Sequence, residues 1–350
     1  MEKNIHFNTE AFVIRQLKDS GLYHKYSAMR NSSRKLFMDF CTGKSLKALT
    51  YDNIFKKIFD FQTNPQRLEH FLSALLGFSV NVVKILPSEG ERLIESGSVM
   101  IMDILVKLED GSIINVEMQK RPYKFSGKRD SCYVSDLIMR QYNELKAKAR
   151  NEDSVFTYQD MKPVYTIIIL EHSYLDMLNH KDVWEHIGKI RFNDGLQMDC
   201  LENIIYIRLD NFKKLVENIT TEKEKWIYLL SADTSEEVLK AASFSEEMFH
   251  IVADVSKFVL NTERVMDMFS EALYMLDRNT EKLMYDEAIE DLERTKKDLS
   301  AEKKRAEQEK LNANIFMMLY QGKDISEIIQ KCKVSEEYIV QLINTMPQIN

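Results

Sequence analysis

The sequence predicts a mixed α/β fold, in which helices flank a mixed sheet and an all-helical C-terminal region follows. Two apolar runs of strand length, Lys162–Leu170 and Asn203–Leu209, alternate with longer helical patterns, which is typical of such a sheet. From about Phe212 onward the sequence shows only helical patterns. The chain has ten glycines and five prolines among its 350 residues, which indicates long helices and few loops.

The composition is that of a soluble globular protein, with 44% apolar and 29% charged residues. The four cysteines lie far apart and form neither a CxxC pair nor a Cys/His cluster, so we expect reduced thiols and no structural zinc. They are Cys41, Cys132, Cys200 and Cys332. The first residues contain no apolar signal region, and no run of about eighteen apolar residues could span a membrane. We therefore expect a cytoplasmic protein without membrane contacts.

We expect five parts along the chain. Residues 1–50 form a helical arm, 51–212 the α/β core and 213–280 a helical region. Residues 281–311 carry charges of both signs without Gly or Pro, and their apolar positions are too sparse for a coiled coil. We expect a charged linker helix there, followed by a small helical tail module over 312–350.

The tail contains the sequence ISEIIQKCKVSEEYIVQLI, which is similar to a helix-turn-helix fragment. A helix that reads DNA needs outward-facing hydrogen-bonding or basic side chains. The last helix instead begins with Ser335-Glu336-Glu337, whose carboxylates would repel phosphate. We therefore expect packing or homo-oligomer contacts from the tail rather than DNA reading.

Two helices are expected before the sheet. Residues 51–60, YDNIFKKIFD, have the apolar spacing of an amphipathic helix. Asp52 and Lys56 stand four residues apart, which is typical of an ordinary ion pair on one helix face. The second helix, over residues 65–76, carries Glu69, which we expect to be solvated.

After a strand expected over residues 80–86, the stretch from Val99 to Gln119 is typical of two strands closed by a turn at Glu109-Asp110-Gly111. Three polar residues, Asp103, Glu117 and Gln119, interrupt its apolar pattern. A carboxylate inside a buried strand is costly unless it is paired, protonated or bound to a metal. These residues are therefore the first candidates for a functional site.

The length of the turn decides whether the two carboxylates can meet. A two-residue turn places Asp103 opposite Met118 and points Glu117 to the other face of the sheet. A three-residue loop with Gly111 in the left-handed conformation pairs Asp103 with Glu117, and glycine adopts that conformation without a steric clash. We expect the three-residue loop. One face of the second strand then forms the wall of a site, with Ile113, Asn115, Glu117 and Gln119, and the other face belongs to the core.

Two carboxylates on neighbouring strands have three explanations. They can share a divalent cation, which prefers oxygen ligands. They can form a general acid/base pair whose pKa values are split. They can also lie on a partly exposed edge hairpin, where polar side chains are simply solvated. The spacing alone leaves all three open.

Positive charge follows the hairpin directly, although the whole chain has a formal net charge of −7. Between Lys120 and Arg150 there are nine Lys and Arg against three Asp and Glu. A phosphate backbone would need this charge beside the carboxylates, and a solvated helix face is the alternative interpretation. On the helix expected over 127–149, Arg129 and Tyr133 project together, either to bind a phosphate or to stack and hold the helix to the sheet.

Asp, then a short hairpin, then Glu-x-Lys is the core of the PD-(D/E)XK nuclease superfamily, and the order of Asp103, the hairpin and Glu117 in this chain resembles it. Four pieces of this chain resemble one family of that superfamily, the Rpn family. The Rpn family comprises recombination-promoting nucleases, which are often labelled transposases. The matching pieces are YDNIFKKIF at 51–59, MDILVKLEDG at 102–111, INVEMQ at 114–119 and GKRDSCYVSDLIMRQY at 127–142. The resemblance covers about residues 51–210 and implies a restriction-endonuclease-like core.

The resemblance implies a metal-dependent DNA endonuclease with Asp103, Glu117 and Gln119 as catalytic residues. Mg²⁺ or Mn²⁺ is the implied cofactor, held by Asp103, Glu117 and the backbone carbonyl of Met118, and it would polarise the phosphate and activate a water. Gln119 stands where the superfamily has Lys, and an uncharged amide orients water but cannot act as a base. DNA is the implied partner. We expect substrate contacts from Lys56, Lys120, Arg129 and Tyr133.

The sequence therefore predicts cleavage of DNA phosphodiesters, related to recombination or transposition. The alternative is a non-catalytic DNA- or protein-binding module that keeps the nuclease fold. That alternative predicts binding without cleavage and no stabilisation by divalent metal. Strand transfer by the two-carboxylate site ranks below simple cleavage, because nothing in the chain identifies the ends of a mobile element.

Overall fold

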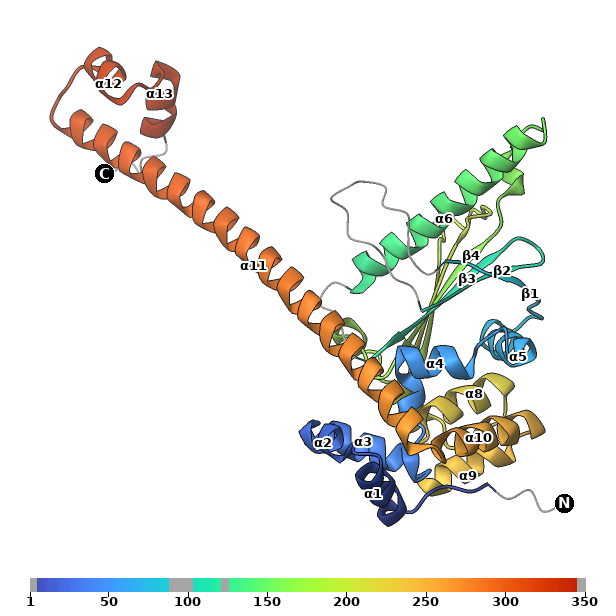
Figure 1. The fold of residues 1–350 in the computed structure, drawn as a ribbon. Helices are drawn as coiled ribbons and strands as arrows, with labels where there is room; N and C mark the ends of the chain where they lie inside the picture. The colour runs from blue at the N-terminus through green and yellow to red at the C-terminus, as the bar shows by residue number, and fades with distance from the viewer. Residues whose placement is uncertain (1–4, 88–102, 121–125, 345–350) are drawn as a thin grey trace. The chain divides into compact units, whose positions relative to one another are not determined.

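The computed structural model describes residues 5–87, 103–120 and 126–344. The chain divides into two compact units, Met1–Asn279 and Thr280–Asn350. One long helix, α11 (Thr262–Tyr320), contains the division. The candidate site belongs to the first unit, which is built around a mixed sheet (Figure 1).

The sheet has six strands in the order β1-β2-β3-β4-β6-β5. They are β1 (Val82–Ile85), β2 (Ile104–Leu108), β3 (Ile113–Gln119), β4 (Val164–Leu170), β5 (Glu185–Lys189) and β6 (Glu202–Arg208). β3, β4 and β6 run parallel, while β1, β2 and β5 pair antiparallel with their neighbours. The strands predicted at β4 and β6 are confirmed. β4 is buried on both faces, as its continuous apolar run indicates, whereas β6 alternates between half-buried and buried residues.

One face of the sheet packs on a helical layer. Its helices include α3 (Asn31–Cys41), α4 (Asp52–Ile58), α5 (Pro65–Leu76), α7 (Leu209–Leu215), α8 (Glu222–Ser231), α9 (Ser235–Ser243) and α10 (Glu246–Val259). The β3 residues Ile114, Val116 and Met118 are buried in the core of this layer. The other face is covered by α6 (Ser126–Asn151), whose Tyr133 and Leu137 pack against both hairpin strands and β4. Because both faces are covered, a polar side chain in β3 must find its partners inside the protein.

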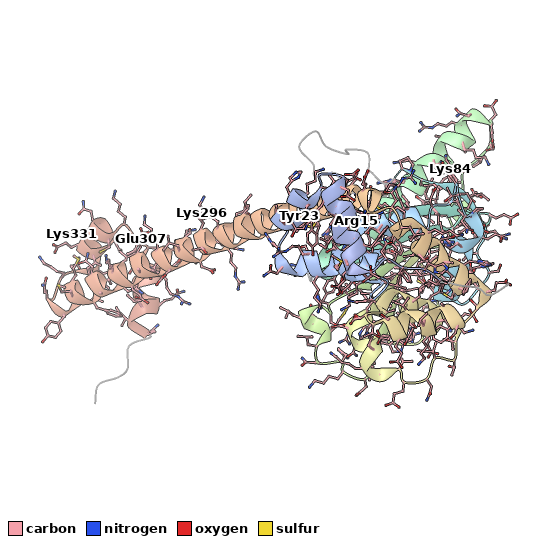
Figure 2. The ribbon with its side chains drawn as sticks, turned by 60° about the horizontal axis from the view of Figure 1, so that its bottom comes forward. Arg15, Tyr23, Lys84, Lys296, Glu307 and Lys331 are labelled. Carbon is pink, nitrogen blue, oxygen red and sulfur yellow. The ribbon has the colours of Figure 1, made fainter. Side chains whose placement is uncertain are left out.

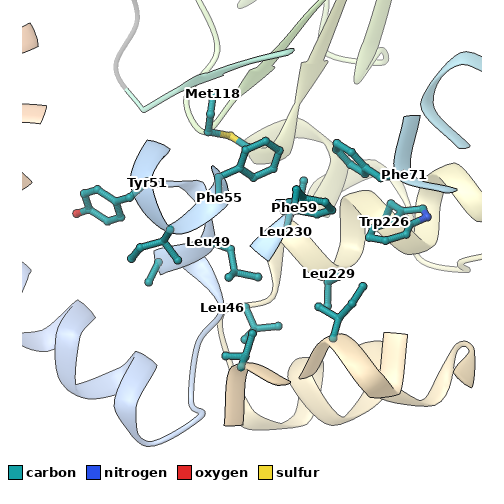
Figure 3. Packing of buried hydrophobic residues seen from close by; sticks show 14 of the residues in the cluster. Leu46, Leu49, Tyr51, Phe55, Phe59, Phe71, Met118, Trp226, Leu229 and Leu230 are labelled. Carbon is teal, nitrogen blue, oxygen red and sulfur yellow. The ribbon is translucent and has the colours of Figure 1, made fainter. Parts of the chain in front are cut away.

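A chain of aromatic rings links the hairpin to the helical layer. Met118 of β3 and Phe55 of α4 both belong to the buried core (Figure 3). Ring centroids are 4.6 Å apart for Phe55 and Phe59, 4.7 Å for Phe59 and Phe71, and 5.3 Å for Phe71 and Trp226. This packing fixes α4 against β3, and α4 in turn brings Lys56 to the hairpin.

The N-terminal residues share this core. The helices α1 (Glu10–Asp19) and α2 (Tyr23–Ala28) precede α3. Phe37 of α3 meets Phe269 of α11 with ring centroids 5.5 Å apart. The arm, the α/β core and the first helical region therefore contribute to one hydrophobic cluster. The division of the chain into five parts stays a prediction.

The second unit is helical. The last part of α11 packs with α12 (Ile325–Cys332) and α13 (Glu336–Asn344) through Ile315, Met318, Ile328 and Ile339. Charged side chains of both signs, such as Lys296, Glu307 and Lys331, are exposed along this unit (Figure 2). The two tail helices lie where the sequence predicts them. Across the described ranges of both units, no helix has the length and apolar character needed to cross a membrane.

Candidate active site at the end of the hairpin

The pairing of β2 with β3 places Ile104 opposite Val116. At the turn, Leu108 donates its N–H to the Ser112 carbonyl at 2.9 Å, which leaves a loop of three residues. Gly111, the last of the three, has φ +92°. The three-residue loop predicted from this glycine is confirmed.

Carrying the same register one residue beyond Ile104 sets Asp103 opposite Glu117. Asp103 lies where the hairpin meets α4. Its Oδ2 accepts the Met118 N–H at 2.7 Å, and its Oδ1 lies 3.7 Å from the Lys56 Nζ. The Asp103 side chain is 8% exposed, so these contacts hold the carboxylate in a largely dry setting.

Glu117 is more deeply buried, with 2% of its surface exposed. Its Oε1 accepts a hydrogen bond from the Asn115 Nδ2 at 3.0 Å. Gln119 is half-buried and, two residues further along the strand, lies on the same face. The structure thus brings Asp103, Glu117 and Gln119 to one end of the hairpin.

The backbone of Met118 also faces this end. The Gln119 carbonyl accepts the Glu171 N–H at 2.9 Å, which directs the polar backbone groups of Gln119 toward β4. Backbone groups alternate in direction along a strand. The N–H and carbonyl of Met118 are therefore directed to the opposite side, where the N–H meets Asp103. The Met118 side chain enters the core on the other face.

Lys120 lies in a network of its own. Its Nζ is 2.6 Å from the Glu171 Oε2, donates to the Thr50 hydroxyl at 2.6 Å, and lies 3.9 Å from the centroid of the Tyr51 ring. The Lys120 side chain is 12% exposed. This network joins the ends of β3 and β4 to the turn before α4. No local pattern in the sequence predicts these contacts.

The register aligns Glu117, Ile168 and Tyr206 in one row across β3, β4 and β6. The first turns of α6 lie over this row. The Tyr206 hydroxyl donates to the Asp130 Oδ2 at 2.7 Å. Burial is the main cause that raises the pKa of Asp130 to about 6, while the hydrogen bond from Tyr206 and the charge of Arg129 act in the opposite direction.

Arg129 and Tyr133 project together from α6, as the sequence predicts. Nε and Nη2 of Arg129 donate to the Tyr133 hydroxyl at 3.1 and 2.6 Å. Tyr133 is buried against the sheet, whereas Arg129 is half-buried. The pair therefore anchors the guanidinium beside the row that contains Glu117.

Residues 49–288 match the model of the PD-(D/E)XK nuclease family transposases. The chain belongs to this family. No curated protein and no solved structure gives a match. The match includes α4, the hairpin and α6, and the six-stranded sheet is the restriction-endonuclease-like core that the resemblance implied.

Some of the charged side chains between Lys120 and Arg150 form ion pairs within this nuclease-family core. Besides Lys120, Arg140 Nε lies 2.7 Å from the Asp136 Oδ2, and Lys107 Nζ lies 2.8 Å from the Glu144 Oε1. These pairs hold α6 together and fix it to β2. The pair of Lys120 with Glu171, which lies outside the segment, offsets one charge of the excess, whereas Asp136 and Glu144 are already counted in it.

Two further acidic residues of the region are Asp52 and Glu69. The Asp52 side chain, and with it the expected ion pair to Lys56, lies outside the described residues. Glu69 accepts the Val82 N–H at 2.8 Å, and Val82 pairs with Leu108 at the turn end of β2. Five residues of strand, roughly 16 Å, separate that end from Asp103.

The family implies a divalent cation, and the donor atoms fit one. Two largely buried carboxylates in directly opposed positions repel each other unless positive charge lies beside them. Lys56 supplies one positive charge, and all candidate donors are oxygens, which Mg²⁺ and Mn²⁺ prefer. In the part of the chain that the structure describes, no group of three or more His, Cys, Asp or Glu could hold a metal. A cation here would need backbone or water oxygens to complete its shell.

Proposed function

We propose that this protein is a metal-dependent endonuclease that hydrolyses DNA phosphodiesters at the open end of the β2–β3 hairpin. The observation that supports it most strongly is the register. The hairpin sets Asp103 opposite Glu117, and the hydrogen bond from the Met118 N–H holds the Asp103 carboxylate at that end. Membership of a nuclease family makes phosphodiester chemistry the first expectation for such a site.

In this proposal, Asp103, Glu117 and the Met118 carbonyl hold one Mg²⁺ or Mn²⁺ ion. When bound, the ion supplies Lewis-acid activation of the scissile phosphate. Gln119 hydrogen-bonds the attacking water and fixes its direction, since a neutral amide is both donor and acceptor. Burial of Asp103 and Glu117 strengthens their interaction with a cation, because little water screens it.

The phosphate backbone is contacted from two sides. Lys56 reaches Asp103 from α4, and Arg129 stands on α6 beside Tyr133, which packs on the sheet. The guanidinium can bind a phosphate through two parallel hydrogen bonds, and Tyr133 orients it. Lys120 is the third cation assigned to the phosphate backbone. Its contribution to phosphate binding is smaller, because its ammonium already lies 2.6 Å from the Glu171 carboxylate.

Two observations favour a second candidate, a DNA- or protein-binding module without cleavage. Gln119 replaces the lysine of the superfamily, and only two metal-ligating side chains meet among the described residues. Such a module predicts DNA binding that divalent metal does not affect.

The test is a nicking assay on supercoiled plasmid with Mg²⁺ or Mn²⁺, using Asp103→Asn and Glu117→Gln. Both changes keep the shape of the side chain and remove its charge, so we expect cutting to fall at least a thousandfold, as for loss of a dominant electrostatic group. Mn²⁺ should also raise the melting temperature of the unmodified protein and not that of either variant.

The matched control is Glu109→Gln. It makes the same chemical change in the same hairpin, but at the turn, where Glu109 is exposed. We expect this variant to cut like the unmodified protein. Cutting that survives in Asp103→Asn or Glu117→Gln would remove the proposed site, and DNA binding without any cutting would favour the second candidate.

A further inference from the structure

Asn115 is a polar residue in a place that favours an apolar one. It lies in the middle of β3, two residues before Glu117, and is 0% exposed. Its neighbours on the same face, Leu105 and Ile113, belong to the apolar cluster beneath α6. A side-chain amide in this position must find hydrogen-bond partners inside the protein.

Only the nitrogen of the amide has such a partner among the described residues. Its Nδ2 lies 3.0 Å from the Glu117 Oε1, and the reversed amide would bring two acceptor oxygens together, so the nitrogen must face Glu117. The Asn115 Oδ1 is therefore directed elsewhere, and no group in residues 5–87, 103–120 or 126–344 donates to it. Thr166, its partner in register on β4, also has a buried hydroxyl oxygen without a partner in those ranges.

The Asn115 Oδ1 and the Thr166 hydroxyl oxygen lower the stability of the folded protein. A buried polar atom that forms no hydrogen bond costs about 1–3 kcal/mol, and an apolar residue of similar shape avoids that cost. Stability alone would therefore favour leucine over asparagine at this position. Among the described residues, the side chain of Asn115 forms a hydrogen bond with Glu117, and local rules of this kind are typically broken at functional sites.

We propose that Asn115 is a positioning residue that fixes the Glu117 carboxylate for binding a divalent cation. This inference rests on the proposed function, since it assigns the cation to the same site. The hydrogen bond from Nδ2 to Oε1 ties one carboxylate oxygen to the strand and restricts rotation of the carboxylate. A ligand held in advance loses less conformational freedom when the ion binds, and partners of this kind are often worth a factor of ten or more in metal affinity.

The test is Asn115→Leu in the full chain, with Mn²⁺ alone as the probe. Leucine has nearly the same shape and removes both the donor and the unpartnered oxygen. We expect the metal-free variant to melt at the same temperature as the unmodified protein or higher. We expect its Mn²⁺ affinity, measured from the electron paramagnetic resonance signal of free Mn²⁺, to fall at least about tenfold. A merely structural residue would shift these two measurements in the same direction.

Thr166→Val is the matched control, because it removes the neighbouring buried hydroxyl and keeps the amide. We expect its Mn²⁺ affinity to stay within about threefold of the original. Asn115→Leu that binds Mn²⁺ like the unmodified protein, or an equal loss in Thr166→Val, overturns the role of Asn115 alone. An unmodified protein that does not bind Mn²⁺ overturns the proposed function with it. If leucine prevents folding, Asn115→Ala gives the same comparison with atoms removed and none added.

Discussion

The Lys56 Nζ lies 3.7 Å from the Asp103 Oδ1, and this contact joins the helix that opens the family match to the hairpin that carries the carboxylates. The Lys56 side chain is 36% exposed. A partly exposed ion pair of this kind contributes at most about 1 kcal/mol to stability, so the contact matters more for the charge that it brings to the site.

Lys56→Gln should therefore change metal and DNA binding in opposite directions. Removing a cation beside Asp103 should raise Mn²⁺ affinity by up to about fivefold, the equivalent of 1 kcal/mol. DNA affinity should fall, and the slope of its logarithm against that of salt concentration should become shallower by about one, as for the loss of one phosphate contact. Fluorescence anisotropy with a labelled duplex at several salt concentrations measures the slope. Lys57→Gln, an exposed neighbour on α4, is the control, and equal changes in both variants would contradict a specific role for Lys56.

The parts of this site that the sequence could predict are the local ones. Gly111 identifies the three-residue loop, because a positive φ at the last loop position favours glycine, and that loop sets the register of Asp103 and Glu117. The apolar runs of β4 and β6 identify the buried centre of the sheet. In contrast, β5 was missed, because its sequence EHIGK is largely exposed and carries no strand pattern.

The contacts that join distant segments could not be predicted. The local pattern suggested Asp52 as the partner of Lys56, whereas the described contact is with Asp103, which lies in another element. The Lys120 network depends on Thr50, which lies 70 residues away. A single sequence carries no signal for such pairs, because only the tertiary fold brings them together.

Lys120→Met tests whether this lysine is mainly structural. Its removal leaves Glu171, whose side chain is 17% exposed, without the ammonium that lies 2.6 Å away. We expect the free energy of unfolding in urea to fall by about 2 kcal/mol, less than for a fully buried pair. Adding Glu171→Gln should recover part of that loss, because no uncompensated charge remains. Lys148→Met, at an exposed position on α6, is the control. Unchanged stability with weakened DNA binding would instead make Lys120 a phosphate contact.

Gly111→Ala should destabilise the hairpin on which the site is built. The loop holds this residue at φ +92°, and an added Cβ would lie 3.2 Å from the Lys162 Cγ. Backbone strain of this kind costs about 1–3 kcal/mol, which chemical denaturation can measure. Gly127→Ala is the matched control, because an added Cβ there meets nothing within 4 Å and the residue lies in α6. Alanine favours helix, so we expect that variant to be as stable as the original or slightly more stable. Equal stability of the two variants would contradict the strain at Gly111.

Asp130 should make stability depend on pH in a direction opposite to that of most carboxylates. Its pKa is raised to about 6 in the folded protein, mainly by burial, against an ordinary value of 3.8. Between these values the folded state holds a proton that the unfolded state has released, so stability falls as pH rises through this window and is constant above it. The difference between the two pKa values corresponds to about 3 kcal/mol.

The measurement is the free energy of unfolding of the unmodified protein minus that of Asp130→Asn, from pH 4 to 7. The other groups that face Asp130 are Tyr206 and Arg129, and His186 pairs with Tyr206 on β5. Burial lowers the pKa of His186, which makes stability rise with pH, but both proteins contain His186, so its contribution cancels in the difference. Tyr206→Phe removes the hydrogen bond that lowers the pKa of Asp130, so the fall should extend to higher pH. A difference that does not change with pH would show that Asp130 ionises in the folded protein as it does in the unfolded chain.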